Sequence, residues 1–265
     1  MIPQAQQKTP TPRRGVEPAL EQLEAAAAIL GVALPALAVD SLRRYAGELL
    51  LWRTRLNLTG AATLSALVDP HLLDVLLLIA AVHIPEGAAV VDVGTGAGLP
   101  GIPLKLIRRD VRLVLVEASR RKVAFLEHLK TALGLDDVRI EWGRAEDFAN
   151  RRDLREMFDI GATRATAHLA AAAELCLPFV RLQGMGVCLK GPGVLRELDY
   201  AAPLVEALGA TIESHEQIPL PTTDMIRTIV ILRKRHTTPE GYPRAAHALG
   251  RPPRLHKGTQ GSAAE

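Results

Sequence analysis

The sequence predicts an α/β fold in which helices cover a mostly parallel, seven-stranded sheet whose last strand is antiparallel. Strand-like and helix-like segments alternate from residue 89 onward, which predicts the parallel part. The first strand, 89–93, ends in a glycine-rich turn that opens a helix, as buried parallel strands do. The antiparallel close is predicted from 211–218 and 226–233, two strand-like segments joined by a short proline-containing turn.

The remaining elements of the sheet region follow from short β-branched segments and from longer segments with apolar residues at helical spacing. The predicted strands are 89–93, 112–116, 138–141, 158–162, 186–189, 211–218 and 226–233. The predicted helices between them are 100–109, 119–133, 167–181 and 194–208. In such a sheet the carboxyl ends of the parallel strands meet at one edge, where ligands of open α/β folds bind.

Composition predicts four parts around this sheet. Residues 1–16 are polar and rich in proline and glutamine, and we expect them to be disordered. Residues 17–83 form a predicted helical cap, and 84–235 form the sheet domain. Residues 236–265 form a basic tail rich in proline and arginine, of which 242–255 either docks on the domain or contacts RNA.

Three helices are predicted in the cap. They cover about 18–30, about 40–56 and a segment that starts near residue 64 or 69 and ends at Val82. Asp40 or Ser41 is the expected N-cap of the second helix, because a short polar side chain there accepts a free backbone N–H.

Length and composition exclude several classes of protein. A chain of 265 residues with 48% hydrophobic side chains can bury a large core. Its two cysteines form neither a disulfide framework nor a metal-ligand spacing, so we expect no metal and a cytoplasmic location. The longest apolar run, 72–82, is too short to span a bilayer, and the first residues contain no signal core. The net charge of +3 permits RNA as a partner without establishing it.

The glycine-rich turn after the first strand predicts a nucleotide-like ligand. Gly94, Gly96 and Gly98 follow Asp92 at alternate positions, and glycine lets a ligand approach bare backbone N–H groups. A dinucleotide fingerprint would have its third glycine at the position of Leu99. The observed spacing is instead typical of S-adenosylmethionine enzymes, with a dinucleotide site and a purely structural turn as alternatives.

Glu117 ends the second predicted strand, 23 residues after Gly94. A carboxylate there can accept both ribose hydroxyls of an adenosine, which suits nicotinamide and methionine-derived cofactors equally. The alternative is a surface ion pair with Arg120 or Lys122.

Ala145 and Glu146 follow the third predicted strand. A backbone N–H and an acid at this place can hold the edge of an adenine ring. A carboxylate at the start of a helix is the equally simple alternative for Glu146.

Arg164 lies just beyond the fourth predicted strand, where a guanidinium can hold a cofactor carboxylate or a substrate phosphate. Its alternative is an ion pair with Asp159 or Glu146. Lys190, at the tip of the fifth strand, suits a phosphate or a base edge, or is a surface lysine. His71 and Asp74 are three residues apart on one helix face, which also fits a simple helix-stabilising pair.

Several motifs together carry a resemblance. They are Asn57-Leu58-Thr59, His71-x-x-Asp74, Asp92 through Pro103, Lys122-Val123-x-Phe125-Leu126, Arg144-Ala145-Glu146, Arg164-Ala165, Leu189-Lys190-Gly191 and Tyr242-Pro243-Arg244. From about Leu49 to Leu255 the chain resembles the bacterial 16S rRNA guanine-N7 methyltransferases, the family once called glucose-inhibited division protein B. It departs at Val75, where the family usually has serine, and in a less basic tail.

The resemblance implies a Rossmann-like class I methyltransferase that binds S-adenosylmethionine and modifies one guanine in the decoding region of the small ribosomal subunit or its precursor. It assigns cofactor binding to Gly94, Leu99, Ala145, Glu146 and Arg164. Together with the residues argued above, the predicted cofactor site is Asp92, Gly94, Gly96, Gly98, Leu99, Glu117, Ala145, Glu146 and Arg164. The predicted catalytic residues are Arg164 and Lys190, and the predicted RNA-binding residues are His71, Arg121, Lys122 and Lys190.

The chemistry fits a site without an evident general base. N7 of guanine carries a lone pair and no proton, so positioning alone can drive methyl transfer. We expect a monomer. The alternatives are a non-catalytic RNA-binding assembly factor on this scaffold, a small-molecule methyltransferase and a nicotinamide oxidoreductase.

Overall fold

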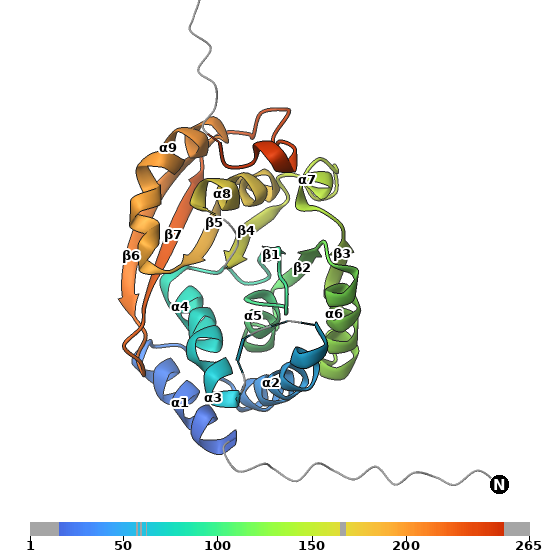
Figure 1. Cartoon of the computed structure of the whole chain (residues 1–265), viewed down its shortest axis with the longest axis vertical. Coiled ribbons are helices and arrows are strands. Elements are labelled where there is room, and N and C mark those ends of the chain that lie inside the picture. The colour runs from blue at the N-terminus through green and yellow to red at the C-terminus, as the bar shows by residue number, and fades with distance from the viewer. Residues whose placement is uncertain (1–15, 57, 59, 62, 165–167, 252–265) are drawn as a thin grey trace, which may run out of the picture.

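The computed structural model describes residues 16–251 except 57, 59, 62 and 165–167, and its centre is a seven-stranded sheet of order β3-β2-β1-β4-β5-β7-β6 (Figure 1). The strands are β1 Ala89–Val93, β2 Arg112–Glu117, β3 Arg139–Trp142, β4 Phe158–Arg164, β5 Val180–Lys190, β6 Ala210–Pro219 and β7 Ile226–Lys234. Strands β1 to β5 pair in parallel, and β7 is antiparallel to both β5 and β6. The predicted parallel sheet with an antiparallel close is confirmed.

The strand order reverses between β1 and β4, because the chain first builds β2 and β3 on one side of β1 and then returns to the other. This reversal opens a crevice at the carboxyl ends of the two strands, where α/β folds bind ligands.

Two layers of helices cover the sheet. The helices of the sheet region are α5 Gly101–Ile107, α6 Arg120–Leu133, α7 Ala145–Phe148, α8 Leu169–Cys176 and α9 Leu198–Ala207. The alternation of side chains along β1 assigns the faces: Val90 packs with residues of α5, α6 and the cap, whereas Val91 packs with residues of α7.

The predicted cap is present and shares the core of the sheet. It consists of α1 Val16–Ile29, α2 Ala36–Leu56, α3 Leu64–Leu67, the π-helical turn Val68–Leu72 and α4 Leu73–Ala81. Residues 64–81 are long and apolar enough to cross a membrane by length and composition, but 59% of this stretch is buried in the fold, as in a core helix of a globular protein. The hydroxyl of Tyr45 in α2 is fully buried and donates a 3.0 Å hydrogen bond to the carbonyl of Ala97 in the glycine-rich turn.

The structure corrects several predicted boundaries. Helix α2 begins at Ala36, so Asp40 and Ser41 lie within it and neither is the N-cap. The carbonyl of Pro35 accepts the N–H groups of Ala38 and Val39 and thereby starts the helix, while the Ser41 hydroxyl donates back to the carbonyl of Leu37.

The fifth strand also begins earlier than predicted. Helix α8 ends at Cys176 instead of residue 181, and β5 starts at Val180, which pairs with Phe158. The pairing then skips to Met185, leaving a bulge between the two registers. A bulge interrupts the alternation of side chains, and for this reason the sequence pattern predicts a strand only over 186–189.

The chain after β7 packs on the domain up to Arg251. Glu174 of α8 is fully buried, and its carboxylate accepts hydrogen bonds from the guanidinium and backbone N–H of Arg244 and from the N–H of Gly250. Burial opposes ionisation of Glu174, but these hydrogen bonds outweigh it and keep its pKa below the usual value. Docking on the domain is thus observed for 242–251. Of the segment 1–16 that is predicted to be disordered, residues 1–15 lie outside the described residues, as do 252–265, whereas Val16 is the first residue of α1.

We expect Glu174→Ala to lower the free energy of unfolding by about 2 kcal/mol, because Arg244 and two backbone N–H groups lose their acceptor. Chemical denaturation measures the loss. The matched control is Glu213→Ala, which removes an exposed carboxylate paired with Arg233 and should cost less than about 1 kcal/mol. Equal losses in the two variants would contradict a special role for the buried pair.

Candidate cofactor and substrate site

Asp92 stabilises the conformation of the glycine-rich turn through hydrogen bonds. It is fully buried, and its Oδ2 accepts hydrogen bonds from the hydroxyl of Thr95 (2.6 Å) and the N–H of Gly101 (2.8 Å). Burial raises the pKa of Asp92 to about 6, although the two hydrogen bonds act in the opposite direction. Asp92 therefore holds both ends of the turn, and its predicted contact with the cofactor stays a prediction.

The three glycines of the turn all have positive φ, and Gly98 has no room for a side chain. A Cβ added at Gly98 would lie 2.6 Å from Cγ1 of Ile102 and 3.3 Å from Leu126. At Gly96 the nearest atoms would be 3.9 Å away, and one of them is the Nζ of Lys122. Lys122, a predicted RNA-binding residue, thus reaches the turn, and its neighbour Arg121 is exposed on α6.

Glu117 joins this turn to the end of β2. It is 7% exposed, and its two carboxylate oxygens accept the N–H groups of Gly96 (2.9 Å) and Ser119 (2.8 Å). The alternative ion pair with Arg120 or Lys122 is absent between these described residues. A carboxylate has about four lone-pair positions, so Glu117 retains acceptor capacity for the hydroxyls of a ribose.

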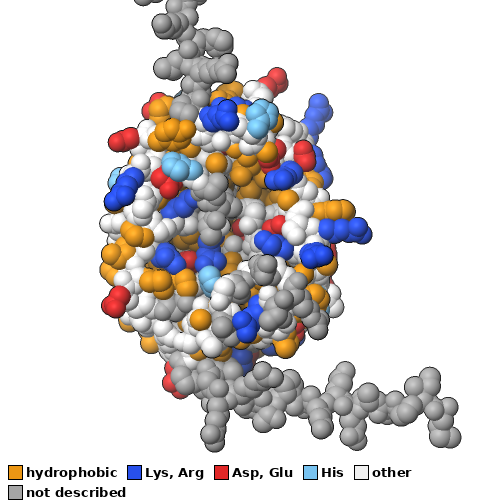
Figure 2. Space-filling view, in the orientation of Figure 1, with side chains coloured by type: hydrophobic (Ala, Val, Ile, Leu, Met, Phe, Trp, Pro, Cys, Tyr) orange, Lys and Arg blue, Asp and Glu red, His pale blue; other side chains and the backbone are white. Residues whose placement is uncertain are grey.

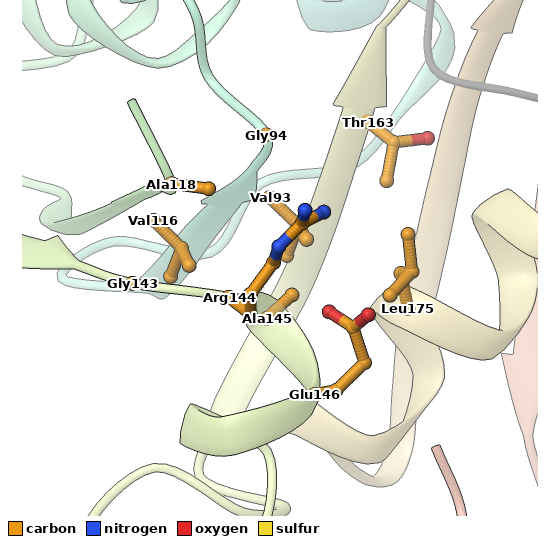
Figure 3. Close-up of a pocket in the computed structure, with 10 residues that line it drawn as sticks. All are labelled: Val93, Gly94, Val116, Ala118, Gly143, Arg144, Ala145, Glu146, Thr163 and Leu175. Atoms are coloured by element: carbon orange, nitrogen blue, oxygen red, sulfur yellow. The ribbon is translucent and has the colours of Figure 1, made fainter. Parts of the chain in front are cut away.

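A pocket lies at the carboxyl ends of β1, β2, β3 and β4 (Figure 3). It contains about 450 Å³ of free space including its open mouth. Its lining is Val93, Gly94, Val116, Ala118, Gly143, Arg144, Ala145, Glu146, Thr163 and Leu175. The side chain of Arg144 extends toward Val93, and the carboxylate of Glu146 points toward Leu175 (Figure 3).

The pocket brings together Gly94, Ala145 and Glu146 from the predicted cofactor site, and Glu117 ends β2 between the lining residues Val116 and Ala118. Apolar walls from valine and leucine suit the faces of an adenine ring, and the carboxylates suit its edge and the ribose. Leu99 is a buried residue of the turn beside the pocket and is not part of its lining. The donor and acceptor groups present therefore fit an adenosyl cofactor.

Arg164 has a partner that sequence analysis did not identify. Its Nε donates a 2.8 Å hydrogen bond to Asp74 of α4, not to Asp159 or Glu146, and Arg227 of β7 donates to the other oxygen of Asp74 at 2.8 Å. Asp74 exposes only 3% of its side chain, against 12% for Arg164 and 19% for Arg227. The simple helix pair of His71 with Asp74 is replaced by this Asp74 cluster, defined as Asp74, Arg164, Arg227 and His71.

His71 completes the cluster as a neutral group. Burial and the charges of Arg164 and Arg227 lower the pKa of His71 to about 4, so its Nδ1 can accept a hydrogen bond from Arg164 at neutral pH. Two guanidinium groups, one carboxylate and a neutral imidazole leave one net positive charge. This net positive charge lies at the strand ends beside the pocket, where it favours the binding of an anion.

Lys190 ends β5 next to this cluster. Leu189 pairs with Arg164, and Lys190 pairs with Thr228, which follows Arg227. Burial lowers the pKa of Lys190. Cys188 and Leu189 belong to clusters on opposite faces, so Lys190 shares the face of Cys188, whereas Arg164 meets Asp74 on the cap side. The two predicted catalytic cations therefore flank the strand tips from opposite faces.

Positive side chains gather around the middle of the face on which these strands end (Figure 2). Among the described residues, no group of three or more His, Cys, Asp or Glu side chains has an arrangement that could hold a metal ion.

The family is decided by sequence comparison. A family model described as rRNA small subunit methyltransferase G matches residues 38–219, which include all but the first two residues of α2, the glycine-rich turn and the Asp74 cluster apart from Arg227. This chain belongs to that family. Among its curated relatives, Ribosomal RNA small subunit methyltransferase G of Moorella thermoacetica is 40% identical over 81% of this chain and 89% of its own length.

The protein of the same name from Halalkalibacterium halodurans is 36% identical over 81% of this chain and 90% of its own length. A solved putative transferase of Pyrococcus horikoshii has a TM-score of 0.51 and 12% identity over 69% of this chain and 67% of that chain, which supports the fold alone. The resemblance to the methyltransferase G family predicted from the motifs is confirmed.

The raised pKa of Asp92 predicts a pH dependence of stability in this family member. The folded chain binds the proton of Asp92 more tightly than the unfolded chain, so its contribution to stability is present below pH 4 and is lost as the pH rises from about 4 to 6. Asp92→Asn has no charge to bury. We expect the unfolding free energy of Asp92→Asn relative to wild type to rise by roughly 1 to 3 kcal/mol between pH 4 and 7. Urea unfolding at several pH values measures this slope; parallel curves for the two proteins would contradict it.

Proposed function

We propose that the protein transfers a methyl group from S-adenosylmethionine to N7 of one guanine of 16S rRNA, as a monomer acting in the cytoplasm on the small ribosomal subunit or its precursor. The observation that carries the proposal is the family match across the turn, the pocket and the Asp74 cluster apart from Arg227. The cofactor supplies an electrophilic methyl group on its sulfonium.

The residues of this chain would bind and orient the two reactants. Glu117 and Glu146 offer carboxylates to the ribose and adenine edge, and the turn held by Asp92 offers its backbone to the remainder of the cofactor. Arg164 and Lys190 are cations at the neighbouring strand tips, suited to hold the phosphate and base edge of a nucleotide. N7 has no proton to lose, so holding it in line with the methyl group supplies much of the rate enhancement.

Reaching N7 requires an unpaired or splayed nucleotide, because a base within a stack cannot approach the donor. Unpaired RNA binds to basic surfaces with an affinity that falls as salt rises. The basic side chains around the strand ends are consistent with such a substrate.

The deciding experiment incubates purified protein with labelled S-adenosylmethionine and either 16S rRNA or small subunits from cells lacking the enzyme, and then maps 7-methylguanine by mass spectrometry. Methylation of one guanine is expected. Transfer to small molecules with no transfer to RNA would overturn the proposal, and tight RNA binding without any transfer would favour an assembly factor.

Lys190→Ala is expected to reduce methyl transfer about 100-fold, because a 1 Å misplacement of a reacting group can cost that much. The matched control is Lys130→Ala, a lysine in the last turn of α6 away from the strand ends. Equal rates for Lys190→Ala, Lys130→Ala and wild type at saturating RNA would show that Lys190 has no role in methyl transfer.

A further inference from the structure

Trp142 is a large aromatic side chain that the fold leaves exposed beside the pocket. It is the last residue of β3, which forms an edge of the sheet, and it is 56% exposed. The next residues, Gly143 and Arg144, line the pocket. The indole N–H donates a 3.2 Å hydrogen bond to the carbonyl of Ala118, another lining residue, so the ring is held in place. Trp142 itself is not part of the lining.

Arginine side chains lie next to the Trp142 ring. The guanidinium of Arg120 lies 5.3 Å from the centroid of the Trp142 ring, and the exposed Arg121 follows it at the start of α6. Between described residues neither arginine forms an ion pair. Figure 2 shows hydrophobic side chains next to Lys and Arg side chains at this edge of the face.

The charged side chains along the rest of β3 form ion pairs, in contrast to the arginines beside Trp142. Arg139 and Arg151 both pair with Glu141 and Asp153. Glu117 lies opposite Trp142 in the neighbouring strand, but it is buried and its carboxylate accepts backbone N–H groups of the turn and of residue 119. On the pocket side, the carboxylate of Glu146 points toward Leu175. The arginines that form no ion pair with a described residue therefore lie at the tryptophan end of this edge.

We propose that Trp142 and Arg120 form a stacking site for an unpaired base of the RNA substrate, a few nucleotides from the guanine that receives the methyl group; this rests on the proposed function. An aromatic face with adjacent arginines is the arrangement that single-stranded RNA binds, the base stacking on the ring and the phosphates pairing with the cations. Three strand spacings, about 14 Å, separate β3 from β4 and its Arg164. A single strand crossing the mouth of the pocket can therefore contact both.

Fluorescence tests the contact directly, because the chain has two tryptophans. In Trp52→Phe, Trp142 is the sole tryptophan, and a phenylalanine can replace Trp52 in its packing against Phe125. A short unstructured oligoribonucleotide is titrated in after saturation with S-adenosylhomocysteine, and binding is followed in parallel by anisotropy of a labelled copy. We expect quenching that follows RNA binding. Quenching by S-adenosylhomocysteine alone, or saturated RNA binding without quenching, would overturn the proposal.

Steady-state kinetics test whether stacking on Trp142 contributes to RNA binding. Trp142→Ala should raise KM for RNA about 5- to 100-fold, with kcat at saturating RNA and the Kd of the cofactor unchanged. Trp142→Phe should restore most of the loss, since a phenyl ring still stacks. The matched control is Leu182→Ala, which truncates another exposed apolar side chain in β5, four strands away from β3.

The outcomes separate this inference from the proposed function. If wild-type protein methylates no RNA, the proposed function fails. If wild type methylates RNA and Trp142→Ala shows the same KM as Leu182→Ala, the stacking site alone is wrong.

Discussion

Gly98→Val is expected to abolish cofactor binding, with an affinity loss of more than about 100-fold. The residue has φ +88°, a conformation that side chains with a Cβ rarely adopt, and its Cβ would lie 2.6 Å from Ile102. The helix that begins at Gly101 packs Ile102 fully buried, so the turn must move away from the pocket instead. Calorimetric titration with S-adenosylmethionine measures the loss.

The control for this substitution lies two residues away. Gly96 also has positive φ, but an added Cβ would meet nothing closer than 3.9 Å. Gly96→Ala therefore costs only backbone strain, roughly 1 to 2 kcal/mol, and should weaken binding about 10-fold. Wild-type affinity in Gly98→Val would show that the turn does not form the cofactor site.

Asp74→Ala has the second large expected effect, a loss of methyl transfer of about 100-fold together with a fall in unfolding free energy of about 2 to 4 kcal/mol. The substitution removes the acceptor shared by Arg164 and Arg227, both largely buried. Two uncompensated guanidinium groups then repel each other, and Arg164 leaves the position at the strand tip. Methyl transfer to RNA and chemical denaturation measure the two losses.

Asp110→Ala is the comparison for stability. It removes a carboxylate that is 31% exposed and pairs with Arg108, so the change should stay below about 1 kcal/mol. If Asp74→Asn, which keeps the shape, retained full activity, the charge of Asp74 would not be what positions Arg164.

Local patterns predicted most of the fold. The β-branched run before the turn, the strand–helix alternation and the proline turn near residue 220 each encode a local structure that the tertiary packing retains. The prediction was wrong at the start of β5 and at the start of α2. In the first case a bulge breaks the periodicity, and in the second a proline carbonyl replaces the expected polar cap.

The site was predicted less completely, because its main contacts join distant parts of the chain. Arg227 is 153 residues from Asp74, and an arginine within a strand has no sequence signature. Tyr45 lies in a helix among apolar residues, and nothing local in the sequence shows that its hydroxyl meets the turn. Glu117, Ala145 and Glu146 could be placed together at one edge of the sheet, because strand ends can be read from local sequence and converge there; their contacts with the cofactor stay predictions.

The hydrogen bond from Tyr45 to Ala97 has a practical consequence for anyone wishing to shorten the protein. It fastens the N-terminal helices to the segment that shapes the pocket, and the same helices supply Asp74 to Arg164 at the tip of β4. A truncated catalytic core starting at β1 would lack both anchors and expose the underside of the sheet to water. A working enzyme is therefore expected to need α2 and α4 as well as the sheet.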